Sequence, residues 1–304
     1  MRKGLSYILL VAALLAGCDG NAPRSTEEAS EANGQNDTTL LSIAVTPTLD
    51  CLPLFVASDH HLFEKQGLRV HLDSYQSQMD QDTALAASRV SGMTTDLVRA
   101  ERLRGQGTAL SYATATQASW QLLTSRTARI KQPHQLRDKM VAMTRFSATH
   151  LLCDLMVDSA KLPTEHVFRI QVNDVAVRLN MLQVGNMDAL LLPEPQATAA
   201  RNMKAHVLYD TRPADLWLGV MVFRENAVDT NRLRLLQKVY DEACDSLNER
   251  GLAAYADVIM RRCNVSRRTV DSLPAHMNYP HWQQPRDRDL QRAQEWLNTK
   301  TRNI

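Results

Sequence analysis

Apolar residues recur from Leu40 to about residue 225 with two periods that alternate along the chain. Short apolar runs have the period of strands, and the stretches between them have the period of helices. The predicted strands cover residues 40–45, 68–72, 91–95, 110–115, 120–124, 140–143, 167–171, 189–192, 205–209 and 216–223. The predicted helices between them cover residues 52–63, 80–90, 96–104, 148–159, 174–182 and 196–203.

This alternation predicts parallel sheets that are covered by helices. The pattern begins again at Met140, so we predict two similar, doubly wound α/β lobes around a cleft. After Asp229 the period is that of helices alone, in residues 232–249, 251–261, 266–273 and 286–298. The expected fold class is therefore α/β, with two lobes and a helical C-terminal tail.

The first residues have the layout of an exported protein. Arg2 and Lys3 precede the apolar run Tyr7–Ala16, which is too short to span a bilayer of about 30 Å as a helix. Small residues follow, and then Cys18, as in a secretory signal peptide. Because a cysteine directly after the cleavage site resembles the bacterial lipobox, we expect residues 1–17 to be a lipoprotein signal peptide and Cys18 to be acylated.

Residues 18–39 contain no Val, Ile, Phe, Trp, Tyr or Met. Such a segment buries too little apolar area to offset chain entropy, so it is predicted to be a disordered tether. Several acyl chains, such as palmitate, anchor a protein stably, whereas one chain binds weakly. We therefore expect a globular body held to the lipid bilayer of the cell envelope through Cys18, facing the periplasm or the exterior.

Composition narrows the class of partner. The formal charge of the chain is +2, and removal of Arg2 and Lys3 with the signal peptide leaves it balanced. A nucleic-acid-binding protein carries a basic stripe, so no nucleic-acid partner is predicted. Cys51 and Cys153 are expected to be buried free thiols, while Cys244 and Cys263, in helical sequence, are left open between free thiols and a disulfide.

Polar residues cluster where predicted strands give way to helices. In open α/β sheets the ligand lies beyond the carboxyl ends of the strands, near helix N-termini. The same residue types also serve as ordinary N-caps, and we weigh ligand contact above capping for the turn 145–150 and for Glu194, which lies between two prolines. The candidate ligand-binding residues are Thr46, Asp50, Ser77, Thr95, Asp96, Arg145, Ser147, Thr149, Asn173, Glu194 and Trp217.

No motif for a cofactor, a metal or a catalytic residue stands out. The chain has no Gly-rich phosphate loop, no GxSxG and no HExxH. His60 and His61 are neighbours on a predicted helix and point about 100° apart, which makes them poor joint ligands of a metal. We therefore predict no cofactor and no metal site.

Three segments together resemble the type II periplasmic substrate-binding proteins of ABC importers, in the branch that binds alkanesulfonates, taurine, nitrate and thiamine precursors. The resemblance covers roughly residues 41 to 225. The segments are Leu62-Phe63-Glu64-Lys65-Gln66-Gly67-Leu68, Val141-Ala142-Met143 with Ser147 and His150, and Arg178-Leu179-Asn180-Met181-Leu182 followed by Met187-Asp188-Ala189 and Leu192-Pro193-Glu194-Pro195.

The resemblance implies that two lobes close on a small molecule and that the loaded protein docks on an ABC permease. It also implies two crossovers between the lobes, near residues 125–131 and 211–216. One lobe then comprises residues 40–127 and 215–304, and the other comprises residues 128–214. The alternatives are a surface or scaffold lipoprotein without a transport role, and an enzyme of thiamine or menaquinone precursor synthesis on the same fold.

The charges at the strand ends favour a particular ligand. Several carboxylates, Glu194 among them, face one obvious cation, Arg145, so a buried anionic ligand would meet Coulomb repulsion. We therefore expect a neutral or cationic planar heterocycle that is hydrogen-bonded by Glu194 and stacked on Trp217.

Overall fold

The computed structural model describes residues 40–301. The expected signal peptide, tether and acylated Cys18 lie outside these residues. Two five-stranded sheets organise the described part of the chain. The fold class predicted from the sequence is confirmed.

The first sheet has the strand order β2-β1-β3-β10-β4. β1 runs parallel to β2 and β3, while β10 runs antiparallel to its neighbours β3 and β4. The strands are β1 (Leu40–Val45), β2 (Arg69–Ser74), β3 (Gly92–Asp96), β4 (Leu110–Ala115) and β10 (Gly219–Arg224). We call these strands, with the helices that cover them, lobe I.

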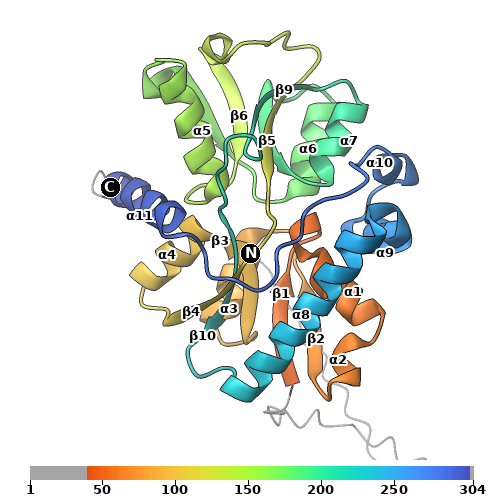
Figure 1. Ribbon diagram of the computed structural model, residues 1–304. Coiled ribbons are helices and arrows are strands. Elements are labelled where there is room, and N and C mark those ends of the chain that lie inside the picture. The colour runs from red at the N-terminus through yellow and green to blue at the C-terminus, as the bar shows by residue number, and fades with distance from the viewer. Residues whose placement is uncertain (1–39, 302–304) are drawn as a thin grey trace, which may run out of the picture. The chain divides into compact units, whose positions relative to one another are not determined.

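The second sheet repeats this plan, with the order β7-β6-β8-β5-β9 and β5 antiparallel to both of its neighbours. Its strands are β5 (Trp120–Thr124), β6 (Lys139–Met143), β7 (Val167–Gln171), β8 (Ala189–Pro193) and β9 (His206–Asp210). These strands and their helices form lobe II, which occupies the upper part of Figure 1.

Helices cover both faces of each sheet. Those before residue 225 are α1 (Leu52–Asp59), α2 (Leu62–Lys65), α3 (Gln78–Ala86), α4 (Leu97–Gly105), α5 (Ala148–Ser159), α6 (Val175–Gln183) and α7 (Gln196–Asn202). The tail contributes α8 (Thr230–Arg250), α9 (Ala256–Cys263), α10 (Arg267–Asp271) and α11 (Asp287–Thr301). The single helix predicted over residues 52–63 is divided into α1 and α2, because His61 has a left-handed backbone conformation (φ 56°).

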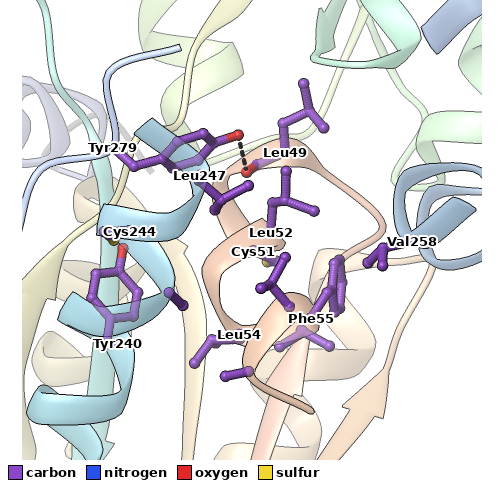
Figure 2. Close-up of a cluster of buried hydrophobic side chains, with 14 of the residues drawn as sticks. Leu49, Cys51, Leu52, Leu54, Phe55, Tyr240, Cys244, Leu247, Val258 and Tyr279 are labelled. Atoms are coloured by element: carbon purple, nitrogen blue, oxygen red, sulfur yellow. Dashed lines mark hydrogen bonds between the residues drawn. The ribbon is translucent and has the colours of Figure 1, made fainter. Parts of the chain in front are cut away.

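The buried apolar residues form three clusters. The first lies on one face of the first sheet, beneath α1, α8 and α9, and Figure 2 shows its centre, where the Tyr279 hydroxyl donates to the Leu49 carbonyl oxygen (3.2 Å). The second is shared by the other face of the first sheet, by α4 and α5, and by one face of the second sheet. The third, beneath α6 and α7, is much smaller.

Two crossovers link the lobes. Residues 116–119 join β4 to β5, and residues 211–218 join β9 to β10. The first crossover therefore lies earlier than the expected residues 125–131, and β5 belongs to lobe II, because all five of its residues are buried between β8 and β9. A Cβ at Gly219 would lie 2.4 Å from the Ala118 Cβ, so glycine permits the start of β10 to pack closely against the first crossover.

The four cysteines of the described residues are buried free thiols, including Cys244 and Cys263, whose state the sequence left open. The last helix, α11, contacts both lobes: the Gln294 amide donates to Glu101 of α4 (2.9 Å), and the Trp296 indole N–H donates to Asp154 of α5 (3.0 Å). Among residues 40–301, no helix combines the length and the apolar composition needed to cross a membrane.

Candidate functional site

A small cavity of about 30 Å³ lies where the carboxyl ends of strands from both sheets meet the first turns of helices. Lobe I contributes residues that follow β1, lie near the end of β3 or begin α3, and lobe II contributes residues from β5, α6 and β8. The lining residues are Thr46, Thr48, Asp50, Gln78, Thr94, Thr95, Trp120, Val175, Arg178 and Pro193. This is the place at which an open α/β sheet presents a ligand site.

The lobe I wall is rich in hydroxyl groups. The hydroxyls of Thr46 and Thr48 lie 2.9 Å apart, and the Thr116 hydroxyl donates to the Asp50 carboxylate at 3.5 Å. Burial raises the pKa of Asp50 and outweighs the opposing hydrogen bonds from Thr48 and Thr116. Asp50 forms no ion pair with any cation of the described residues.

The lobe II wall holds a buried cation, Arg178. The residue is 1% exposed, and its Nη1 donates to the Leu191 carbonyl oxygen at 2.6 Å, while its Nε has no partner among the described residues. Burial lowers the pKa of Arg178 to about 10, against the opposite effect of Asp174, so the side chain remains charged at neutral pH.

Three buried polar atoms on the lining residues lack a hydrogen-bond partner: the Thr95 Oγ1, the Gln78 Oε1 and the Arg178 Nε. Most buried polar groups in folded proteins are satisfied. Their residues line one cavity from both lobes, and sites of this kind bind small molecules through a few polar groups.

Hydrogen bonds join the lobes around this cavity. The Oδ1 of Asp96 accepts from Arg99 N at the start of α4 (3.0 Å) and from Ala148 N at the start of α5 (2.9 Å). Burial raises the pKa of Asp96 to about 6, although the charge of Arg99 and both hydrogen bonds act in the opposite direction. The Leu49 N–H also donates to the Glu194 carbonyl oxygen (2.9 Å), so the structure is that of closed lobes.

The structure brings several of the predicted residues together. Thr46, Asp50 and Thr95 line the cavity, and Asp96 joins the lobes beside it. Ser77 lies at the N-cap of α3 and forms an isolated β-bridge with Asp174 of lobe II.

The turn before α5 is occupied by its own hydrogen bonds. The Ser147 hydroxyl donates to the Thr144 carbonyl oxygen (2.7 Å), and the Thr149 Oγ1 accepts from Thr144 N (2.9 Å). Arg145 is exposed, and the Asn173 amide contacts the Met79 sulfur at 2.9 Å. None of Arg145, Ser147, Thr149 and Asn173 is among the residues that line the cavity.

The structure does not bring Glu194 and Trp217 together as the holders of a heterocycle. The Glu194 carboxylate accepts from Thr198 N (2.9 Å) and pairs with Arg201 (3.0 Å), so it caps α7. The Trp217 indole donates to Asp215 (2.7 Å) and its ring faces the Arg286 guanidinium at 5.7 Å. Neither side chain lines the cavity.

Sequence reasoning missed seven of the lining residues: Thr48, Gln78, Thr94, Trp120, Val175, Arg178 and Pro193. The sequence itself contains a signal that could have identified Arg178 as a site residue. Val175 and Leu182 are buried on α6, and Arg178 shares their face at a spacing of three and four residues. A charged residue on the apolar face of a helix is unusual and indicates a functional position.

No known family model and no curated protein sequence matches the chain. Several solved structures do match the chain. The zinc-bound ligand-binding component of an ABC-type import system from Staphylococcus aureus aligns with a TM-score of 0.74 and 15% identity, over 88% of this chain and 93% of that one. The chain has the periplasmic binding protein fold.

Two further structures share the fold. The alkanesulfonate-binding protein SsuA from Xanthomonas axonopodis, bound to MOPS, aligns with a TM-score of 0.75 and 14% identity, over 86% of this chain and 92% of that one. The nitrate-binding protein NrtA from Synechocystis aligns with a TM-score of 0.67 and 15% identity, over 82% and 74% of the two chains. The TM-scores establish the shared fold, but at identities this low the ligands of these proteins do not indicate the ligand of this chain.

Within residues 40–301, no group of three or more His, Cys, Asp and Glu side chains has the arrangement of a metal site. The cavity described here offers hydroxyl, amide, carboxylate and guanidinium groups, which suit an organic molecule or a small ion.

Proposed function

We propose that this protein is a solute-binding lipoprotein that captures a small polar molecule between its lobes and delivers it to an ABC-type importer. One observation carries the proposal: Gln78, Thr95 and Arg178 line a cavity whose two walls belong to different lobes, and each of them has a buried polar atom without a hydrogen-bond partner. The shared fold and the lipobox-like sequence at Cys18 support it.

A ligand that contacts both walls stabilises the closed lobes relative to open ones, in proportion to its extra affinity for the closed form. Opening requires rotation at the two crossovers, residues 116–119 and 211–218. Gly219, directly after the second crossover, packs against Ala118 of the first. Hinges of this kind concentrate backbone change in a few residues between rigid bodies. Capture and release then need no chemical step.

An enzymatic role for this cavity would need a reactive group. Cys51 is the nucleophile beside it, with its sulfur 3.1 Å from the Thr94 hydroxyl. Burial raises the pKa of the Cys51 thiol to about 12, so the thiol is protonated and unreactive at neutral pH. This chemistry favours binding over catalysis.

Native mass spectrometry of the full chain released in detergent tests ligand capture. We expect a co-purified small molecule, or one acquired from a periplasmic extract, and a smaller radius of gyration by small-angle scattering when the site is saturated. Thr95→Val removes a cavity hydroxyl at constant shape and should weaken the complex. Thr83→Val, the same change at an exposed position of α3, should leave it unchanged. Failure of any small molecule to bind, or binding without compaction, would contradict the proposal.

The lipid anchor is tested separately. Cys18→Ala should move the protein from the detergent phase to the aqueous phase without lowering its unfolding temperature, because the change leaves every contact among the described residues 40–301 in place. Equal partitioning of wild type and variant would remove the anchor from the proposal and leave ligand capture intact.

A further inference from the structure

The first sheet carries a group of cations at the edge that faces away from the cavity. The pairing register brings the first residues of β1, β2 and β3 to this edge, together with the end of β10 and the start of β4. The helix α8 also begins here, at the lower end of lobe I in Figure 1. We call this end of lobe I the basic edge.

Five cations of the basic edge form no ion pair with a carboxylate of the described residues. The Arg224 Nε donates to the Val90 carbonyl oxygen (3.2 Å), and the Lys238 Nζ donates to the Gln66 side chain (3.1 Å), so these partners are neutral. The cations come from the end of α2, the segment before β3, the end of β10 and the first half of α8. They are Lys65, Arg89, Arg224, Arg234 and Lys238.

The carboxylates of the described residues at the basic edge do not balance this charge. Asp229 is already paired with Arg232 (2.6 Å). Glu64 lies 3.9 Å from His61, and Glu225 is exposed. Glu64 and Glu225 thus oppose the five cations, and the basic edge has a positive field that extends about 8–10 Å into solution at physiological salt.

The chain enters lobe I at the same edge. Leu40, the first residue of β1, is 39% exposed, and the expected tether of residues 18–39 ends directly before it. Acyl chains on Cys18 would therefore attach a bilayer to the end of the body that carries the cations.

The cations are spread out rather than gathered in a groove. They follow an edge that is five strands wide, which is about 20 Å at a spacing of about 4.8 Å between strands. An array of this width suits a flat layer of phosphate groups better than a single acidic peptide, such as the tether with its Glu27, Glu28 and Glu31.

We propose that the basic edge docks on an anionic phospholipid surface, with its cations against the headgroup phosphates. This inference rests on the lipid anchor of the proposed function and adds the orientation of the body, in which lobe I lies on the bilayer and lobe II points away. Each Lys or Arg near an anionic bilayer strengthens binding about fivefold, and salt screens this attraction. The cavity lies at the opposite edge of the sheet, so docking leaves it uncovered.

Energy transfer from the body to the bilayer tests the orientation. The acylated full chain is placed in vesicles of phosphatidylcholine alone or with about 30% phosphatidylglycerol, which carry an acceptor dye on their headgroups. Because the native cysteines of the described residues are buried, Ala87→Cys at the basic edge and Thr164→Cys, directly before β7 of lobe II, each give one exposed site for the donor dye. We expect transfer from position 87 to be at least twofold higher on anionic than on neutral vesicles and to fall in about 0.5 M salt. Transfer from position 164 should stay low on both.

Charge variants assign the surface. Replacement of Lys65, Arg89, Arg234 and Lys238 by Gln, all at exposed positions, should lower transfer from position 87 on anionic vesicles to the level seen on neutral ones. Lobe II offers a matched control with four exposed cations between β5 and β6. Their replacement by Gln, at Arg126, Arg129, Lys131 and Arg137, should leave the transfer unchanged.

Three results would overturn the inference: equal transfer from position 87 on both vesicles, loss of transfer in the lobe II variant, or a wild-type signal in the variant of the basic edge. High transfer on both vesicles that falls when Glu27, Glu28 and Glu31 are replaced by Gln would assign the cations to the tether instead. Failure of the anchor is a separate result, because the chain would then not stay on neutral vesicles. Its sedimentation with anionic vesicles, and the loss of that binding in the variant of the basic edge, would still decide whether the cations hold lipid.

Discussion

The sheets of the two lobes share one strand order but differ in the helices and the buried apolar side chains that cover one of their faces. Each sheet has a single antiparallel strand in its fourth position, β10 in lobe I and β5 in lobe II. One face of the first sheet lies beneath α1, α8 and α9 and the large cluster shown in Figure 2. The corresponding cluster in lobe II lies beneath α6 and α7 alone and contains few side chains.

From this difference we expect the two lobes to differ in stability although they share one topology. Lobe II leaves large apolar side chains exposed, with Phe168 50% exposed and Val184 59% exposed. Local opening is easiest where few apolar contacts hold an element. The helix that carries Arg178, α6, therefore belongs to the less strongly held side of the cleft, while lobe I is the firmer scaffold.

Core truncation should give the largest effect and should separate the lobes. Phe55→Ala in α1 removes a ring at the centre of the lobe I cluster and should lower the free energy of unfolding by about 3–5 kcal/mol. Leu182→Ala in the thin cluster of lobe II should cost about 2 kcal/mol, because the site can collapse toward solvent. Urea unfolding measures both, and equal losses would remove the contrast.

Acid should act on lobe II where it meets α11. His150 accepts from Phe146 N (3.2 Å) and packs edge-on against Trp296 at 4.9 Å. Burial, reinforced by the charges of Arg169, Lys300 and Arg145, lowers its pKa from 6.5 to about 4, although Asp154 opposes the shift. The unfolded chain therefore takes up a proton between pH 6.5 and 4 that the folded chain does not.

The contribution of His150 is thus complete above pH 6.5 and is lost as the pH falls toward 4, by roughly 1–3 kcal/mol. Asp96 has the opposite sign, since its raised pKa of about 6 adds stability at low pH that is lost as the pH rises from 3.8 through 6. The comparison of wild type with His150→Gln by urea unfolding at pH 4.5 and 7 isolates the histidine. Identical pH dependence in both proteins would contradict the assignment.

Hydrogen exchange should resolve the contrast at the level of single helices. We expect buried amides of α6 to exchange at least tenfold faster than those of α8, which corresponds to about 1.4 kcal/mol in opening free energy. We expect this because α8 buries Leu236, Tyr240 and Leu247. In contrast, Val177 of α6 and Val184, directly after its last residue, are exposed. Equal protection of both helices would show that the small apolar cluster beneath α6 does not make its local opening easier.

The smallest effect should come from the exposed apolar residues of lobe II. Val184→Ser should change the free energy of unfolding by less than about 0.5 kcal/mol, because a side chain that is 59% exposed gains little from burial. The matched change Val239→Ser in α8, where the side chain is fully buried, should cost several times more. Comparable losses would mean that Val184 is covered in solution.

Periodicity predicted nearly every strand and helix, because local apolar spacing reflects which face of an element is buried. The family resemblance placed the first crossover too late, since the membership of Trp120–Thr124 depends on pairing with strands far along the chain. Among the site residues, Thr46, Asp50 and Thr95 follow from the rule that ligands lie at strand ends. The positions of Glu194 and Arg178 depend on their hydrogen-bond partners. Glu194 pairs with the Arg201 side chain and Arg178 with the Leu191 backbone carbonyl, and the spacing of residues along the sequence does not reveal either partner.

The position of β10 has a consequence for the order in which the chain can be completed during synthesis. All strands of the second sheet lie between Trp120 and Asp210, so that sheet can form as soon as this segment is available. In the first sheet β4 pairs only with β10, which is made about a hundred residues later, after the whole of the second sheet. The lobe that begins first in the sequence is therefore the last to be finished, and until Arg224 is added its strand β4 remains without a partner.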